Sequence, residues 1–92
     1  MTTETSELRI VRDQVRDYIQ QNFLYGNTAL RLEDDTSLLG EGIVDETGML
    51  EVVLFVEETY GLTVTEEDLG PANFDTVASI ARYVVDHLPP EA

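Results

Sequence analysis

The sequence lacks the residues that build several common kinds of site. Its 92 residues contain no cysteine, which excludes disulfides, a thiol nucleophile and a cysteine-based metal site. Lysine is also absent, and five arginines stand against 19 acidic residues, so the formal net charge is −14. This charge argues against direct binding to nucleic acid or an anionic membrane. It favours basic protein surfaces as partners.

Long apolar runs are missing too. No run approaches the roughly 18 residues of a membrane span, and the polar start MTTETSE lacks the basic and apolar regions of a signal peptide. We therefore expect a cytoplasmic protein. Hydrophobic residues nevertheless make up 42% of the chain and recur periodically, so the acidity does not indicate disorder. The length predicts one domain over residues 1–92, ordered from about residue 6 to 88. We also expect the protein to be a monomer.

Catalytic motifs are not found. Gly40, Gly42 and Gly48 fit neither a dinucleotide-binding nor a Walker pattern, and the acids near residues 34 and 45 do not have the spacing of a calcium loop. His87 has no second histidine or cysteine with which to bind a metal. The sequence shows no nucleophile with a base, so we expect a protein that is not an enzyme.

Helical periodicity appears in the first and last parts of the chain. One helix is predicted over residues 6–22, its arginines pairing outside the core with Asp13 and Asp17. A last helix is predicted from a cap at Asp75 or Thr76 to Leu88. The apolar side of the first helix contains Leu8, Val11, Val15, Tyr18, Ile19 and Asn22, and that of the last contains Val77, Ile80, Ala81, Val84 and Leu88.

Residues 23–44 have no period and predict a long first loop. Ser37 within it is expected to supply a turn or cap hydroxyl. Further on, residues 62–64 predict a loop, residues 65–68 a capped single turn, and residues 71–73 a short helix. Apolar residues pin the long loop to the core: Phe23, Leu24, Leu30, Leu32, Leu38, Leu39, Ile43 and Val44.

The stretch GIVDETGMLEVVLFVEETY, residues 42–60, is central to the sequence. Asp45 is the expected N-cap of a helix that ends at Gly61, and Glu46 lies in its first turn, where the helix dipole favours an anion. Gly48 lowers helix propensity by about 1 kcal/mol relative to alanine. It indicates either a flexible first turn or simple tolerance near a helix end. The core side is Met49, Val52, Val53, Val56 and Tyr60, with Phe55 at its border.

The opposite side of this helix places Leu50 and Leu54 among Thr47 and the glutamates 51, 57 and 58. Exposed apolar residues with a negative rim suit a protein partner. The alternative is an ordinary solvated face that carries two leucines.

The same stretch resembles the centre of an acyl carrier protein or peptidyl carrier domain. The likeness runs from about Leu8 to Leu88 and includes the segments DTSLL (35–39) and NFDTV (73–77). It implies an all-α bundle of three longer helices and one short helix with a long first loop. In that family a serine after the motif's aspartate receives 4′-phosphopantetheine, whose thiol carries an acyl or aminoacyl cargo as a thioester. That position is Glu46 here, beside Asp45.

The resemblance implies a set of partners and a docking face. The partners would be a phosphopantetheinyl transferase, an adenylating or acyl-loading enzyme, and a downstream transferase or condensing enzyme. Matching family positions make Glu51, Leu54, Glu57 and Glu58 docking residues. The predicted docking set also includes Leu50, and Thr47 at its edge. Thr47 stands where the family often has leucine.

Glu46 admits three hypotheses, because a carboxylate cannot replace the hydroxyl in that phosphodiester. The first, which we favour, is a carrier whose serine was replaced by engineering, so that this chain cannot be modified. The second is a natural pseudo-carrier that acts as a non-catalytic regulator or scaffold through its acidic helix. In the third, attachment moves to Thr47, which points about 100° away around the helix.

Overall fold

The computed structural model describes residues 6–24 and 32–88. Within these ranges lie α1 (Ser6–Asn22), α2 (Glu46–Tyr60), a 3₁₀ turn η1 (Glu66–Asp68), α3 (Pro71–Phe74) and α4 (Val77–His87). The same residues contain no β-strand. The predicted all-α fold of three longer helices and one short helix is therefore confirmed. The expected anchor Leu30 falls outside the described residues.

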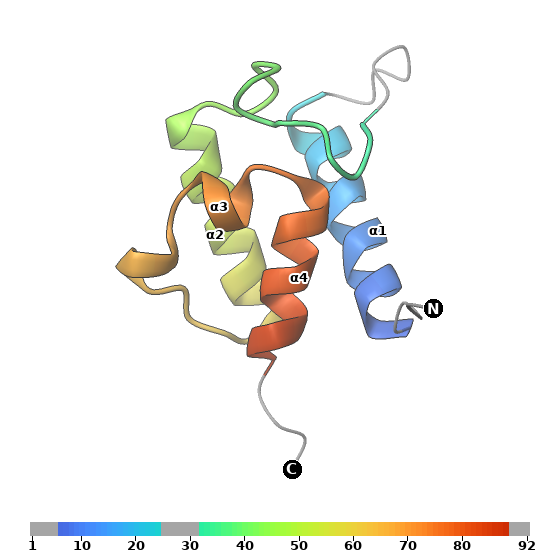
Figure 1. Ribbon diagram of the computed structural model, residues 1–92, viewed down its shortest axis with the longest axis vertical. Helices are drawn as coiled ribbons and strands as arrows, with labels where there is room; N and C mark the ends of the chain where they lie inside the picture. The colour runs from blue at the N-terminus through green and yellow to red at the C-terminus, as the bar shows by residue number, and fades with distance from the viewer. Residues whose placement is uncertain (1–5, 25–31, 89–92) are drawn as a thin grey trace.

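The core forms where the apolar stripes of the three longer helices meet. α1 and α4 lie side by side and make the most extensive contact between helices, while α3 packs on α4 (Figure 1). Each fully buried aliphatic or aromatic side chain contributes about 1.5–3 kcal/mol. The buried residues include Val11, Val15 and Ile19 of α1, Val52, Val53 and Val56 of α2, Phe74 of α3, and Val77, Ile80, Ala81, Tyr83 and Val84 of α4.

Local sequence sets the helix ends. α4 begins with a capping box, in which the Thr76 side chain accepts from the Ser79 N–H while the Ser79 hydroxyl accepts from the Thr76 N–H. It ends at His87, so the prediction that Leu88 belongs to the helix is wrong. Leu88 precedes a proline, which disfavours helical backbone at that residue. It remains half-buried against the core.

The turn at residues 65–68 forms without the predicted side-chain cap. Thr65 makes no capping hydrogen bond through its side chain. Its carbonyl instead accepts from the Asp68 N–H at 3.0 Å, which closes the 3₁₀ turn through backbone alone. Residues 62–64 form a loop, as predicted.

The described part of the long loop, residues 32–44, runs across one end of the bundle (Figure 1). Leu32, Leu38 and Val44 are buried and hold it to the core, as the sequence predicts. The Ser37 hydroxyl donates to the Asp75 carboxylate at 2.6 Å and accepts from the Gly40 N–H at 2.9 Å. Ser37 therefore has the predicted turn role.

A loop carboxylate also connects α1 with α4. Asp34 forms ion pairs with Arg12 and Arg16 of α1, and its carbonyl accepts from the Ala78 N–H of α4 at 2.9 Å. Arg16 pairs with Asp13 at 3.2 Å, as predicted. The predicted role of Asp17 belongs instead to Asp34, which is 18 or more residues from both arginines in sequence and meets them only after folding.

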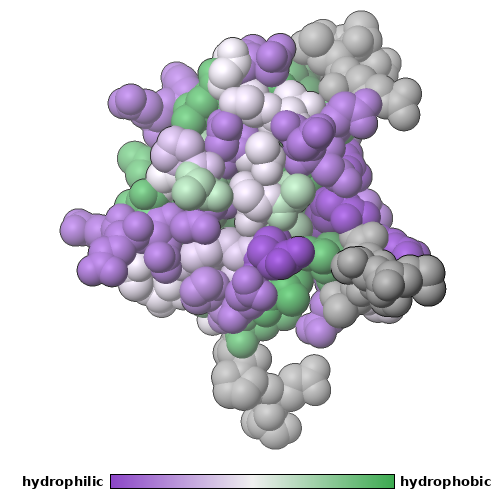
Figure 2. Space-filling model, viewed as in Figure 1, coloured by the Kyte–Doolittle hydropathy of each residue, from purple (hydrophilic) through white to green (hydrophobic). Residues whose placement is uncertain are grey.

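Charge is divided unevenly between the helices. α1 carries three arginines and three acids, whereas α2 carries four glutamates and no basic residue. On the face drawn in Figure 2, hydrophilic residues predominate and hydrophobic ones show only in separate patches. No helix among the described residues is long and apolar enough to span a membrane.

Candidate functional site

The tip of α2 has the cap that its sequence predicts. The Asp45 carboxylate accepts from the Gly48 N–H at 2.7 Å, and the Asp45 carbonyl accepts from the Met49 N–H at 2.8 Å. These bonds satisfy backbone groups that a helix start leaves unpaired. Glu46, the next residue, lies in the first turn and is exposed to solvent.

Gly48 has a packing role that neither sequence interpretation contained. It is buried, and a Cβ at this position would lie 2.8 Å from the ring of Phe23 and 3.1 Å from a Val44 methyl. A glycine therefore lets the first turn of α2 lie directly against the end of α1. The sequence predicts Phe23 as an anchor of the long loop to the core, which it contacts, but no pattern in the sequence indicates that it packs under the tip of α2.

Position 46 does not fit the phosphopantetheine group that the family resemblance implies. The tip is open to solvent, but the Glu46 side chain ends in a carboxylate and offers no hydroxyl for a phosphodiester. Thr47 is exposed as well, and its hydroxyl projects one helical step of about 100° from position 46. The attachment chemistry of the family is therefore not available to Glu46.

Most of the predicted docking residues lie together on the outer side of α2. Leu50 and Leu54 are 56% and 53% exposed, and Thr47, Glu51 and Glu58 are exposed beside them. These large apolar side chains are left uncovered in a face that is otherwise acidic. We call these five residues the outer α2 face.

Glu57 departs from this group. It is half-buried, and its carboxylate accepts from the Val64 N–H at 2.9 Å. Glu57 therefore fastens the loop after α2 to the helix. Its predicted docking role remains a prediction, but its geometry is that of a structural acceptor.

Two hollows flank the outer α2 face. One, of about 300 Å³, lies at the tip and includes Phe23, Asp45, Thr47 and Glu51. The other, of about 470 Å³, lies between α1 and α2 and also includes Glu51. Sequence reasoning missed the α1 side of this second hollow, formed by Tyr18 and Asn22. The polar Asn22 on the apolar side of α1 was the available signal.

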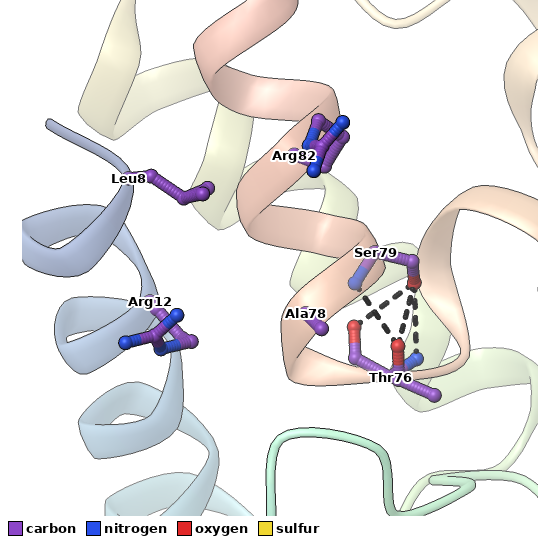
Figure 3. A pocket seen from close by; sticks show the side chains of 6 residues that line it. All are labelled: Leu8, Arg12, Thr76, Ala78, Ser79 and Arg82. Atoms are coloured by element: carbon purple, nitrogen blue, oxygen red, sulfur yellow. Dashed lines mark hydrogen bonds between the residues drawn. The ribbon is translucent and has the colours of Figure 1, made fainter. Parts of the chain in front are cut away.

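A third hollow, of about 410 Å³, lies between α1 and α4 (Figure 3). Its charged lining residues, Arg12 and Arg82, are positive, whereas those of the other two hollows are negative. Its hydroxyls, from Thr76 and Ser79, hydrogen-bond each other and the local backbone. Arg12 is paired with Asp34. Thr76, Ser79 and Arg12 serve the α4 cap and the loop, and the exposed Arg82 alone does not make a binding site, so this hollow is not the candidate site.

No arrangement of three or more acids or histidines that could hold a metal ion occurs among the described residues. The ring of His87, in the last turn of α4, stacks on Tyr83 with ring centroids 4.0 Å apart. Its Nδ1 lies 2.8 Å from the Tyr83 carbonyl oxygen. The histidine therefore packs within its own helix turn.

The fold is similar to that of a chain in a crystal structure described as "FAD-dependent dehydrogenase". The TM-score is 0.67 and the identity 27%, and the match covers 76% of this chain and 97% of that chain. The matched chain is accordingly short, about 70 residues, the size of one small domain. No protein-family model and no curated protein sequence matches the chain.

Proposed function

We propose that this chain is a carrier-type docking protein, built to present the tip and outer face of α2 to basic enzymes. In its serine form it would carry an acyl or aminoacyl cargo as a thioester. In the present sequence Glu46 prevents loading. The observation that carries the proposal is the exposed position 46 beside the Asp45 cap, adjoining the outer α2 face, on a bundle of three longer helices and one short helix.

This proposal assigns no catalytic residue to the chain. Asp45 holds the tip by capping the helix, and Gly48 permits its close packing on Phe23. Leu50, Leu54 and the exposed glutamates provide a weak, rapidly exchanging contact, because opposite charges speed association more than they strengthen the final complex. The enzymes expected to use this contact are a phosphopantetheinyl transferase, a loading ligase and a condensing or transferring enzyme.

The decisive experiment replaces one side chain. The present chain, Glu46→Ser and Glu46→Ala are each incubated with coenzyme A and a broad-specificity phosphopantetheinyl transferase, and intact masses are measured. We expect only Glu46→Ser to gain the mass of one arm. Glu46→Ala controls for loss of the charge, and Glu46→Ser combined with Thr47→Ala tests Thr47 as the acceptor.

The outcomes separate the hypotheses. A mass gain by the present chain would show that attachment occurs elsewhere and that Glu46 does not block it. An unchanged mass for every variant would contradict the carrier function. Modification of the serine form that disappears with Thr47→Ala would move the acceptor to Thr47.

A second candidate is a natural pseudo-carrier that regulates or scaffolds an enzyme without a prosthetic arm. What supports it is Glu46 itself, together with the likeness to a small chain in a structure described as an FAD-dependent dehydrogenase. We therefore propose such a flavoenzyme as one partner. Affinity purification of the present chain from its source cell should yield a complex with the visible absorbance of flavin. A flavin-free complex would argue against this partner.

A further inference from the structure

The hollow between α1 and α2 combines an aromatic wall with acidic ends. Tyr18 and Asn22 of α1 face Glu51, Leu54, Phe55 and Glu58 of α2 across it. We call this hollow the α1–α2 groove. Its volume of about 470 Å³ is enough for a large side chain of a partner.

The wall of the groove is held in place by ring contacts. The rings of Tyr18 and Phe55 stack at a centroid distance of 4.0 Å and an interplanar angle of 14°. The Tyr18 hydroxyl donates to the Glu51 carbonyl at 3.3 Å, and Phe23 and Tyr60 contact the stacked pair edge-on. The groove is therefore preorganised and does not need to order itself when it is occupied.

The acidic ends of the groove are available to a partner. Glu51 and Glu58 are both exposed and lie seven residues apart, which is about 10 Å along the helix. Neither carboxylate forms a hydrogen bond or ion pair with the described residues. Burial is the main cause that raises the pKa of Tyr18, and the nearby charges of Glu51 and Glu58 raise it further. Both carboxylates therefore act electrostatically on the aromatic wall.

Other acids of the fold have structural partners. Glu57 accepts from the Val64 N–H, Asp45 from Gly48, and Asp68 from the Tyr83 hydroxyl at 2.8 Å. Glu57 is engaged with Val64 on the side of α2 that faces the following loop. The unpaired carboxylates of Glu51 and Glu58 lie instead on the α1 side of α2, next to the rings of the groove. Docking is therefore favoured over the seam between α1 and α2.

We propose that the α1–α2 groove receives an arginine side chain of a partner enzyme, an inference that rests on the proposed docking function. The guanidinium lies against the aromatic wall and donates to Glu51 or Glu58, and its apolar stem covers Leu54. Arginine suits the groove better than lysine. Its planar group stacks on rings and is more weakly hydrated, whereas an ammonium is a compact, strongly hydrated charge.

The test uses small probes on the full chain, followed by ¹⁵N–¹H NMR. Titration with N-acetylarginine amide should give saturable shifts at the amides of Tyr18, Asn22, Glu51, Phe55 and Glu58. N-acetyllysine amide should bind at least about threefold more weakly, the ratio expected when an aromatic contact at an exposed site is lost. Equal affinity for the two probes would overturn the proposal.

Matched variants distinguish binding in the groove from a general effect of net charge on binding. Glu51→Gln with Glu58→Gln should abolish saturable binding, whereas Glu66→Gln with Glu67→Gln removes the same charge from the exposed η1 turn and should leave binding unchanged. Phe55→Leu keeps an apolar side chain and should bring the ratio of the affinities for the arginine and lysine probes close to one. Circular dichroism verifies that this variant is folded. Equal losses in the two double variants would overturn the groove as the site.

The groove and the carrier function fail in distinguishable ways. Arginine binding with no modification of Glu46→Ser would retain the groove and reject the carrier function. Modification of Glu46→Ser without selectivity for arginine would retain the carrier function and reject the groove.

Discussion

At the scale of single residues, Tyr83 shows how a polar group is accommodated in this small core. It is only 4% exposed, stacks on His87 and donates its hydroxyl to Asp68 at 2.8 Å. Burial, followed by the hydrogen bond and charge of Asp68, raises the pKa of Tyr83 to about 12. The sequence pattern placed only aliphatic residues and alanine on the core side of the last helix, so this tyrosine was missed.

A pH-dependent loss of stability follows from Tyr83. Because its folded-state pKa lies above the usual 10.0, its contribution to stability is complete below pH 10 and is lost as the pH rises toward about 12. Tyr83→Phe should lower the free energy of unfolding by about 1 kcal/mol at neutral pH, through loss of the hydrogen bond. Urea unfolding at a series of pH values measures both chains.

The difference between wild type and Tyr83→Phe should shrink above pH 10. Tyr60→Phe is the comparison. Burial alone raises the pKa of Tyr60, and its hydroxyl donates to Gln14 at an exposed site, so its effect on stability should be smaller and should change less with pH. A difference that stays constant through pH 12 would contradict the assignment of the raised pKa to Tyr83.

At the scale of elements, the glutamates of α2 divide into two kinds. Glu57→Ala removes the acceptor of the Val64 N–H and should cost about 1 kcal/mol of stability. Glu58→Ala, at an exposed position without such a bond, should change stability by less than about 0.5 kcal/mol. In the Glu46→Ser background, Glu58→Ala should instead raise the KM of the phosphopantetheinyl transferase.

Urea unfolding and steady-state kinetics on the same two variants check this division. Equal destabilisation by both variants would mean that the hydrogen bond from the Val64 N–H to Glu57 does not contribute to stability. A larger KM effect from Glu57→Ala would place docking on the side of α2 toward the following loop, against the α1–α2 groove.

Helices were the predictable elements. Residues 6–22 and the start and end of α2 follow from apolar periodicity and from the caps Asp45 and Gly61, which are local signals. The ties of the long loop could not be predicted in the same way. Asp34 and Asp75 meet partners more than 15 residues away, and nothing local marks which acid will bond which loop or helix.

At the scale of the whole molecule, excess negative charge opposes the compact state. With a net charge of −14, repulsion between carboxylates should be relieved by screening, so added sodium chloride should raise the melting temperature. Calorimetric scans across a salt series measure the effect. The double variant Glu66→Gln with Glu67→Gln, which removes two of the repelling charges from the exposed η1 turn, is the control and should show a smaller rise with salt. A melting temperature indifferent to salt would show that the charges are already well compensated.

The candidate site was predictable only in part, because local sequence signals do not specify contacts between distant elements. Its tip and the outer α2 face come from one continuous stretch, so their residues could be named from helix geometry alone. The wall of the α1–α2 groove comes from Tyr18 and Asn22 on another helix. Its position depends on how the two helices cross, which periodicity does not specify.

The uneven division of charge has a further physical effect. Because α1 carries three arginines and three acids while α2 carries four glutamates without a basic residue, the negative charge of α2 is not offset within its own helix. A positively charged surface is therefore attracted toward α2 before the two molecules touch, and this attraction weakens as salt is added.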